Sequence, residues 1–141
     1  MTSDAPPKLI PWTDDLSVGI SSIDAQHQRL VAMTNDLHAA IVSGRGAAVV
    51  ARTLVGLLAY TVSHFAYEEK LLGETGYPGF EQHHAEHQRL VGAIKELQRD
   101  LAAGKPALSV DVRQFLKNWL RTHIRGTDQK YSQHLQASGV T

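Results

Sequence analysis

The stretch HHAEHQRL, residues 83–90, sets three histidines within five positions and ends in a phrase that occurs twice in the chain. The earlier copy is AQHQRL at 25–30, and the later copy is AEHQRL at 85–90. The whole chain has only 8 histidines, so their concentration here is unusual. A phrase repeated at a spacing of 60 positions indicates that the same helical unit is used twice.

Length and composition limit the classes of protein to consider. The chain has 141 residues and 43% hydrophobic residues, which fits one globular domain over 1–141. Lys+Arg and Asp+Glu balance at 14 each, so no basic field is available for nucleic acid or an anionic membrane. The absence of Cys excludes disulfides, thiolate metal sites and cysteine catalysis. No secretory signal and no uninterrupted apolar run long enough to span a membrane is evident, so we expect a cytoplasmic protein.

Apolar periodicity predicts an all-α fold. Residues 1–20 contain Pro6, Pro7 and Pro11 and are expected to form an extended arm that packs on the body. Ser21 or Ser22 can cap a first helix beginning near Ile23. Further helices are expected at about 47–72, 81–103 and 109–126, the last capped by Ser109, with a short helical tail to Gln136. Short connections favour an up-down-up-down four-helix bundle over 21–136.

The repeat concentrates polar groups inside this bundle. A shift of 60 positions places His27 on His87 and Glu68 on Asp128, and it brings His64 within one residue of His123. His64 and Glu68 are four residues apart, as are His83 and His87, so each pair shares a helix face. His123 and Asp128 are five apart, about 140° round a regular helix. We therefore expect the fourth helix to end at Gly126 so that Asp128 can turn back.

Seven such groups suit two metal ions better than one. Unpaired in a bundle core, five imidazoles and two carboxylates would be very costly, and a single tetrahedral zinc takes only four ligands. We expect Glu68 and Asp128 to bridge two ions, together with a bridging oxygen. Mixed imidazole and carboxylate ligands suit Fe, Zn, Cu or Ni, with Fe favoured for a redox-active pair.

The two halves differ at one position, because His83 falls on Ile23. One ion would then have three imidazoles, from His83, His87 and His123, and the other would have two, from His27 and His64. The two-His ion keeps a coordination position free in apolar surroundings that include Ile23. Such a position suits a small neutral gas. Glu69, about 100° from Glu68 on the helix, is expected to be a surface charge.

The pattern resembles that of the hemerythrin family, in particular its stand-alone bacterial members. The motifs that carry the resemblance cover about residues 10–131: Trp12, Val18-Gly19, Ile23-Asp24-x-Gln26-His27, His64-Phe65-x-x-Glu68-Glu69, Tyr77-Pro78, His83-x-x-x-His87, Trp119-Leu120-x-x-His123-Ile124 and Asp128-x-x-Tyr131. The resemblance implies reversible O₂ binding at a non-haem di-iron centre with a bridging oxo or hydroxo group. It also implies a gas pocket lined by Leu30, Phe65, Trp119 and Ile124, with Tyr131 beside the cluster.

Other functions remain open at this stage. A ferritin-like di-iron oxidase or peroxidase needs four Glu and two Glu-x-x-His pairs. This chain offers Glu81-x-x-His84, off the face of His83, and a looser Asp24-x-x-His27. A signalling module is a second alternative, in which iron oxidation moves the arm around Trp12 toward an unidentified client protein. No hydrolase motif is present, so we expect a monomeric O₂-binding protein that is not an enzyme.

Overall fold

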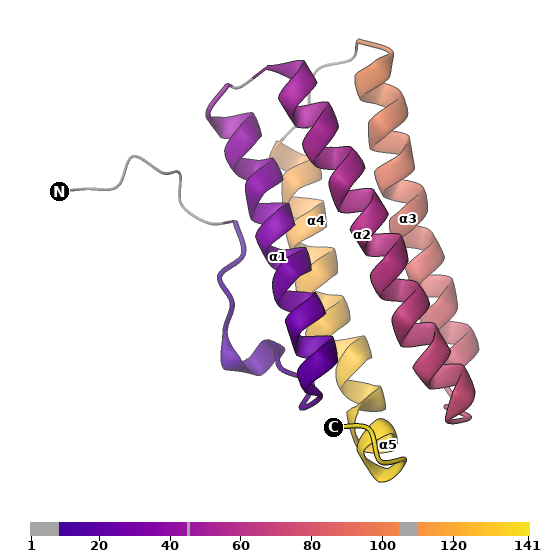
Figure 1. Cartoon of the computed structure of the whole chain (residues 1–141). Helices are drawn as coiled ribbons and strands as arrows, with labels where there is room; N and C mark the ends of the chain where they lie inside the picture. Colours follow the sequence, from indigo (N-terminus) through magenta and orange to yellow (C-terminus); the bar gives the residue numbers. More distant parts are fainter. Residues whose placement is uncertain (1–8, 45, 105–109) are drawn as a thin grey trace, which may run out of the picture.

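The protein is an up-down-up-down bundle of four helices, seen in a computed structural model (Figure 1). The structure describes residues 9–44, 46–104 and 110–141. The helices are α1 (Ser21–Val42), α2 (Ala47–Glu74), α3 (Phe80–Ala102) and α4 (Val110–Thr122), followed by a π-helical turn η2 (His123–Asp128) and a short α5 (Gln129–Ala137). A single 3₁₀ turn, η1 (Asp14–Leu16), lies in the arm. The predicted fold class is confirmed; the Ser109 cap lies outside the described residues.

The first two long helices each carry a polar group between two apolar groups. Along α1, Ile23 belongs to one buried apolar cluster, Leu30 belongs to another, and the buried His27 lies between them. Along α2, Glu68 lies in the same way between Phe65 and Leu72. When the helices pack, these positions form a polar layer with an apolar cluster at either end. The fold therefore shields the polar layer from water on both sides.

The sequence repeat is also a structural repeat. Residues 21–30 and 81–90 show the same order of buried, half-buried and exposed positions. The buried positions are Ile23, His27 and Leu30 in α1, and their counterparts at 83, 87 and 90 in α3. α1 packs against α2, and α3 packs against α2 from its other side. The two copies thus present the same face toward the common core.

The described part of the arm packs on the bundle, as expected. Asn35 of α1 accepts a hydrogen bond from the Ile10 amide and donates one to the Ile10 carbonyl, both at 2.8 Å. Leu16 and Val18 are buried. The predicted cap by Ser21 or Ser22 is wrong: α1 begins at Ser21 with no side-chain cap. Instead, Asp24 accepts a hydrogen bond from the Val18 amide at 2.8 Å, which fixes the arm where it enters the helix.

Gly19 shapes the same entry. Its φ of 74° lies in the left-handed region, which side chains rarely adopt. A Cβ here would also stand 2.6 Å from Nε2 of Gln136, the group that donates to the Gly19 carbonyl. The left-handed turn therefore requires glycine, and a side chain here would also make the Gln136 amide give up its present position.

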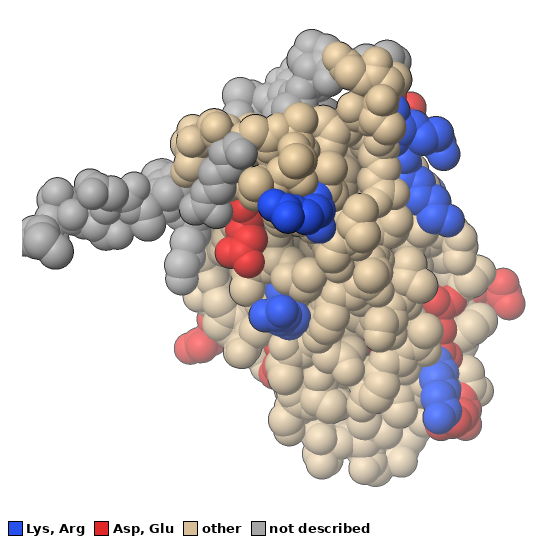
Figure 2. Space-filling view, turned by 45° about the horizontal axis from the view of Figure 1, so that its top comes forward, with Lys and Arg blue, Asp and Glu red and all other residues tan. Residues whose placement is uncertain are grey.

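α2 is long and apolar enough, by length and composition, to cross a membrane. Within the bundle it lies between α1 and α3 and buries His64 and Glu68, as expected of a core helix. On the face drawn in Figure 2, basic and acidic side chains are interspersed over a largely uncharged surface. This agrees with the balanced composition.

We predict that Asn35→Ala loosens the arm and lowers the free energy of unfolding by about 1 to 3 kcal/mol, because both polar groups of Ile10 lose their partner. Urea unfolding measures the loss, and hydrogen exchange of residues 9–20 reports the loosening. Asp36→Ala, at the exposed neighbouring position, is the matched control. Equal stability of the two variants would show that Asn35 does not anchor the arm.

Candidate metal centre

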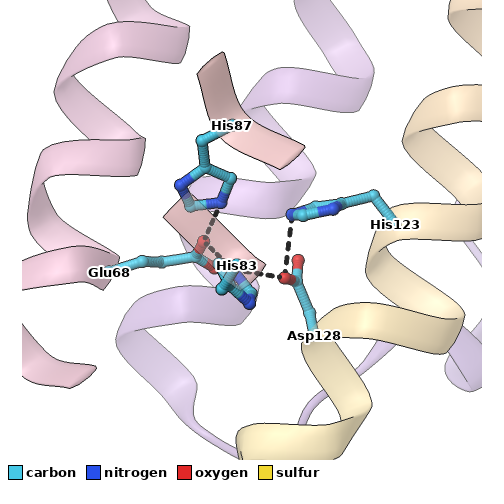
Figure 3. A group of neighbouring side chains, drawn as sticks. All are labelled: Glu68, His83, His87, His123 and Asp128. Atoms are coloured by element: carbon cyan, nitrogen blue, oxygen red, sulfur yellow. Dashed lines mark ion pairs between the residues drawn. The ribbon is translucent and has the colours of Figure 1, made fainter. Parts of the chain in front are cut away.

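The seven residues singled out in the sequence meet in the core of the bundle. They come from α1, α2, α3 and the π turn that follows α4, and none is more than 4% exposed: His27, His64, Glu68, His83, His87, His123 and Asp128. Their possible ligand atoms form two overlapping groups, within each of which all atoms lie within 4.8 Å of one another. Figure 3 shows the larger group, with the imidazoles of His87 and His123 pointing toward Glu68 and Asp128.

The two carboxylates divide their oxygens between two sets of imidazoles. Glu68 Oε1 lies 3.2 Å from His87 Nε2 and 3.5 Å from His83 Nε2. Its other oxygen, Oε2, lies 3.1 Å from His27 Nε2 and 3.3 Å from His64 Nε2. Each end of this carboxylate therefore faces a different group of histidines.

Asp128 repeats this division from the other side. Its Oδ1 lies 3.1 Å from His83 Nε2 and 3.0 Å from His123 Nε2, whereas Oδ2 lies 3.1 Å from His27 Nε2. One oxygen of each carboxylate thus belongs with a three-imidazole set, and the other belongs with a two-imidazole set. This arrangement can hold two cations side by side with both carboxylates between them.

The position of Asp128 corrects the sequence analysis. The fourth helix does not end at Gly126; it widens into a π-helical turn from His123 to Asp128 and continues as α5. Hydrogen bonds in a π turn join residues five apart, so His123 and Asp128 are brought onto one side of the helix. The extra residue in the π turn therefore brings Asp128 onto the side of His123, which the sequence analysis attributed to a helix end at Gly126.

Three outer contacts of the imidazoles were missed in the sequence. His64 Nδ1 donates to Gln26 Oε1 at 2.7 Å, and His123 Nδ1 donates to Glu86 Oε2 at 3.0 Å. A longer contact of 3.4 Å joins His87 Nδ1 to Glu69. Glu69 also pairs with His84, and only 18% of its side chain is exposed, so the expectation of a surface charge is wrong.

A signal for two of these contacts was present in the repeat. Gln26 and Glu86 directly precede His27 and His87, at matching places in the two copies of the phrase. Each reaches from its own helix to the histidine of the next helix. Such a contact depends on how neighbouring helices pack, so spacing within one helix does not reveal it.

The protonation of the imidazole nitrogens makes this set of side chains suitable for binding metal ions. Carboxylate and amide oxygens can only accept, so His64, His87 and His123 carry their proton on Nδ1 and turn an Nε2 lone pair inward. The inward lone pairs of His87 and His123 then face acceptor-only oxygens of Glu68 and Asp128. Among the described residues, the Nε2 atoms of His83, His87 and His123 and both Asp128 oxygens have no hydrogen-bond partner. A nitrogen lone pair that faces a carboxylate oxygen is unfavourable in a buried site, and a cation between the two atoms stabilises both.

The charges of the two acids act on the histidines. Burial alone would lower the pKa of His27, but Asp128 and Glu68 raise it to about 10. The same pair raises the pKa of His83 to about 9 against burial. Burial would raise the pKa of Glu68, yet His64 and the other imidazoles hold it well below its usual value. Both carboxylates are therefore ionised at neutral pH and attract cations, whether protons or metal ions.

Tyr131 completes the inner surroundings. Its hydroxyl donates to Glu68 Oε2 at 2.6 Å, on the oxygen that faces the two-imidazole set. The side chain is fully buried. Burial and the nearby charges of Asp128 and Glu68 raise the pKa of Tyr131 well above its usual value, so it stays a neutral donor.

Comparison with known proteins agrees with this geometry. The family described as the hemerythrin HHE cation binding domain matches residues 18–135. The chain belongs to the hemerythrin family. It is 40% identical to a bacteriohemerythrin of Stenotrophomonas maltophilia (strain R551-3) over 92% of this chain and 83% of the relative. It is 32% identical to a myohemerythrin of Riftia pachyptila over 92% of this chain and 96% of the relative.

Solved hemerythrin structures share the fold. A crystal structure of wild-type hemerythrin superposes with a TM-score of 0.84 at 33% identity, covering 90% of this chain and 98% of that one. The resemblance proposed from sequence motifs is therefore confirmed at the level of the family and the fold. The cluster can hold a metal, as expected of a cation binding domain.

We predict that metal loading at pH 7 releases about two protons per chain, because His27 and His83 are protonated below pKa values of about 10 and about 9 and must be neutral to bind metal. Titration of Fe²⁺ or Zn²⁺ into weakly buffered protein, followed with a pH indicator, measures the release.

The released number should fall as the pH rises from 7 toward 9, since His83 then loses its proton before metal arrives. Release that is independent of pH would contradict these pKa values.

Proposed function

We propose that this hemerythrin binds O₂ reversibly at a non-haem di-iron centre with a bridging oxo or hydroxo group. The single observation that carries the proposal is the division of Glu68 and Asp128 oxygens between a three-imidazole set and a two-imidazole set. Iron in the first set would be held by His83, His87 and His123, and iron in the second by His27 and His64. The second set offers one imidazole fewer and therefore leaves room for a ligand.

The two iron ions supply the redox chemistry, and the protein residues supply position and exclusion of water. The three Nδ1 contacts made by Gln26, Glu69 and Glu86 fix the orientation of the rings that they touch. Phe65 stacks on His87 at 3.6 Å between ring centroids, and Trp119 stacks on His123 at 4.5 Å. These large apolar side chains keep bulk water from the imidazoles.

A small apolar cavity supports the choice of a neutral gas as ligand. It has a volume of about 20 Å³ and is lined by Leu30, Thr34, Leu57, Thr61, Leu90, Ile94, Leu116, Trp119 and Leu120. Its two threonine hydroxyls donate to carbonyls of their own helices, so they offer no free donor to water. An apolar cavity of this size suits a diatomic molecule better than a polar substrate, which would find few hydrogen-bond partners there.

The residues expected to line the gas pocket fall into two groups. Leu30, Phe65, Trp119 and Ile124 pack in or against the apolar cluster that contains this cavity. Ile23 belongs to the second cluster, on the side of Tyr131. We propose that the first four line the approach of the gas, and that Ile23 keeps the position matching His83 free of a ligand.

The oxidase alternative is not favoured by the positions of its key residues. Glu81 is exposed, and His84, with 43% of its side chain exposed, pairs with Glu69 outside the centre. The Glu81-x-x-His84 pair therefore contributes nothing to the cluster, which remains rich in histidine. A monomeric, cytoplasmic carrier that is not an enzyme remains our expectation, and the signalling alternative would require the arm to move with the redox state.

The central test combines metal content with reversibility. Protein grown with ample iron should contain about two iron ions per chain. After anaerobic reduction, O₂ should produce a visible absorption band that disappears under argon and returns over repeated cycles. About one ion per chain would contradict the two-metal arrangement, and net consumption of O₂ in each cycle would indicate an oxidase instead.

We further predict that Ile23→His slows O₂ binding by roughly tenfold or more, because the new imidazole takes the position that His83 takes in the other half. Stopped-flow mixing of reduced protein with O₂ measures the rate. Ile23→Val is the control, since it keeps the position apolar. Unchanged O₂ kinetics in an iron-loaded His variant would contradict the free position at the two-His iron.

A further inference from the structure

Gln26 and Glu86 are equivalent residues with different charge. They occupy matching positions of the repeat, one residue before His27 and His87, and both are half-buried. Each accepts a hydrogen bond from Nδ1 of a histidine on the next helix in its own half, at 2.7 Å for His64 and 3.0 Å for His123. The backbone repeat thus builds the same contact twice, once with an amide and once with a carboxylate.

The other outer contact increases this difference. Glu69 Oε2 lies 3.4 Å from His87 Nδ1, so two of the three imidazoles in the three-His set face carboxylates. In the two-His set, His64 faces the neutral amide of Gln26. The Nδ1 atom of His27 has no hydrogen-bond partner among the described residues. The negative outer charge is therefore confined to one side of the centre.

Such a difference has a direct chemical effect on a bound metal. A carboxylate that accepts the Nδ1 proton makes the imidazole a stronger electron donor, and its charge favours the more oxidised metal. An amide orients the ring without adding charge. The Glu86 carboxylate is 26% exposed, so water screens its charge only in part and the charge still acts on the buried ligands.

We propose that Gln26 and Glu86 are positioning residues that make the two iron ions unequal in reduction potential. Glu86, together with Glu69, lowers the reduction potential of the three-His iron. Gln26 adds no charge, so the two-His iron, where a ligand can enter, keeps the higher reduction potential. This inference rests on the proposed di-iron centre and states how its two halves are tuned.

The test exchanges the two side chains, which have nearly the same shape. In iron-loaded protein without O₂, Glu86→Gln should raise the mean midpoint potential and Gln26→Glu should lower it. We expect each to change the ratio of oxidised to reduced iron at a fixed potential by about tenfold. Spectroelectrochemical titration measures the shift. The controls are Glu81→Gln and Gln28→Glu, which make the same charge changes at exposed positions of the same helices.

The double variant Gln26→Glu with Glu86→Gln keeps the net charge and moves the carboxylate to the other half. Because Glu69 still faces His87, each side then has one outer carboxylate, and Mössbauer spectra of half-oxidised protein should show the first oxidation spread more evenly over the two irons than in the wild type. Potentials that match the surface controls, or that shift in the same direction in both single variants, would overturn the proposal. These redox measurements are made without O₂. An iron-loaded protein that fails to bind O₂ in a separate experiment would contradict the proposed function, but it would not change the outcome of the redox measurements.

A second measurement covers variants that lose iron. In wild-type protein loaded with Zn²⁺, which has no redox chemistry, NMR should place the Nδ1 proton of His123 further downfield than that of His64, as expected for a carboxylate acceptor. In Glu86→Gln the two resonances should approach each other. Equal positions of these resonances in the wild type would overturn the proposal without reference to iron.

Discussion

Two buried carboxylates are the constraint on which the structure depends. Glu68 and Asp128 are fully buried and ionised at the core of a bundle that would otherwise be apolar. Their charge favours the surrounding imidazoles, and the whole cluster can hold cations, either protons on the imidazoles or metal ions between the ligands. The acids and histidines therefore depend on one another, since removal of either would leave the other with the full cost of burial, and in the proposed centre the metal ions would share in this compensation.

The apolar clusters at either end of this layer provide its rigidity. Because α1 and α2 alternate apolar, polar and apolar groups, their polar residues are held in place by packing above and below as well as by their own contacts. The fixed arm and α5 close one end, where Gln136 binds the Gly19 carbonyl and Ser132 binds that of Val18. A rigid, dry environment of this kind favours reversible ligand binding, since it holds the coordination geometry and excludes water.

The sequence predicted the bundle, its helix order and the meeting of all seven polar residues, because residues four apart must share a helix face. The sequence did not predict the backbone that brings His123 and Asp128 together. A π turn does not follow the regular period of 3.6 residues, so apolar periodicity does not reveal it. Such turns occur often at functional sites. The sequence analysis also failed for Gln26, Glu69 and Glu86. Their roles depend on the distance between neighbouring helices, which the pattern of a single helix does not contain.

For the proposed centre, the repeat explains how one fold could produce two unlike metal sites. Symmetric backbones place matching side chains at matching points, so a difference between the sites requires only a few substitutions. Ile23 opposite His83 changes the number of imidazoles, and Gln26 opposite Glu86 changes the charge behind them. Both differences leave the two-His side with less electron donation, and the first also leaves more room for a ligand there. The proposed asymmetry thus needs only these side-chain differences and the π turn of the second half, in a bundle whose first and third helices repeat.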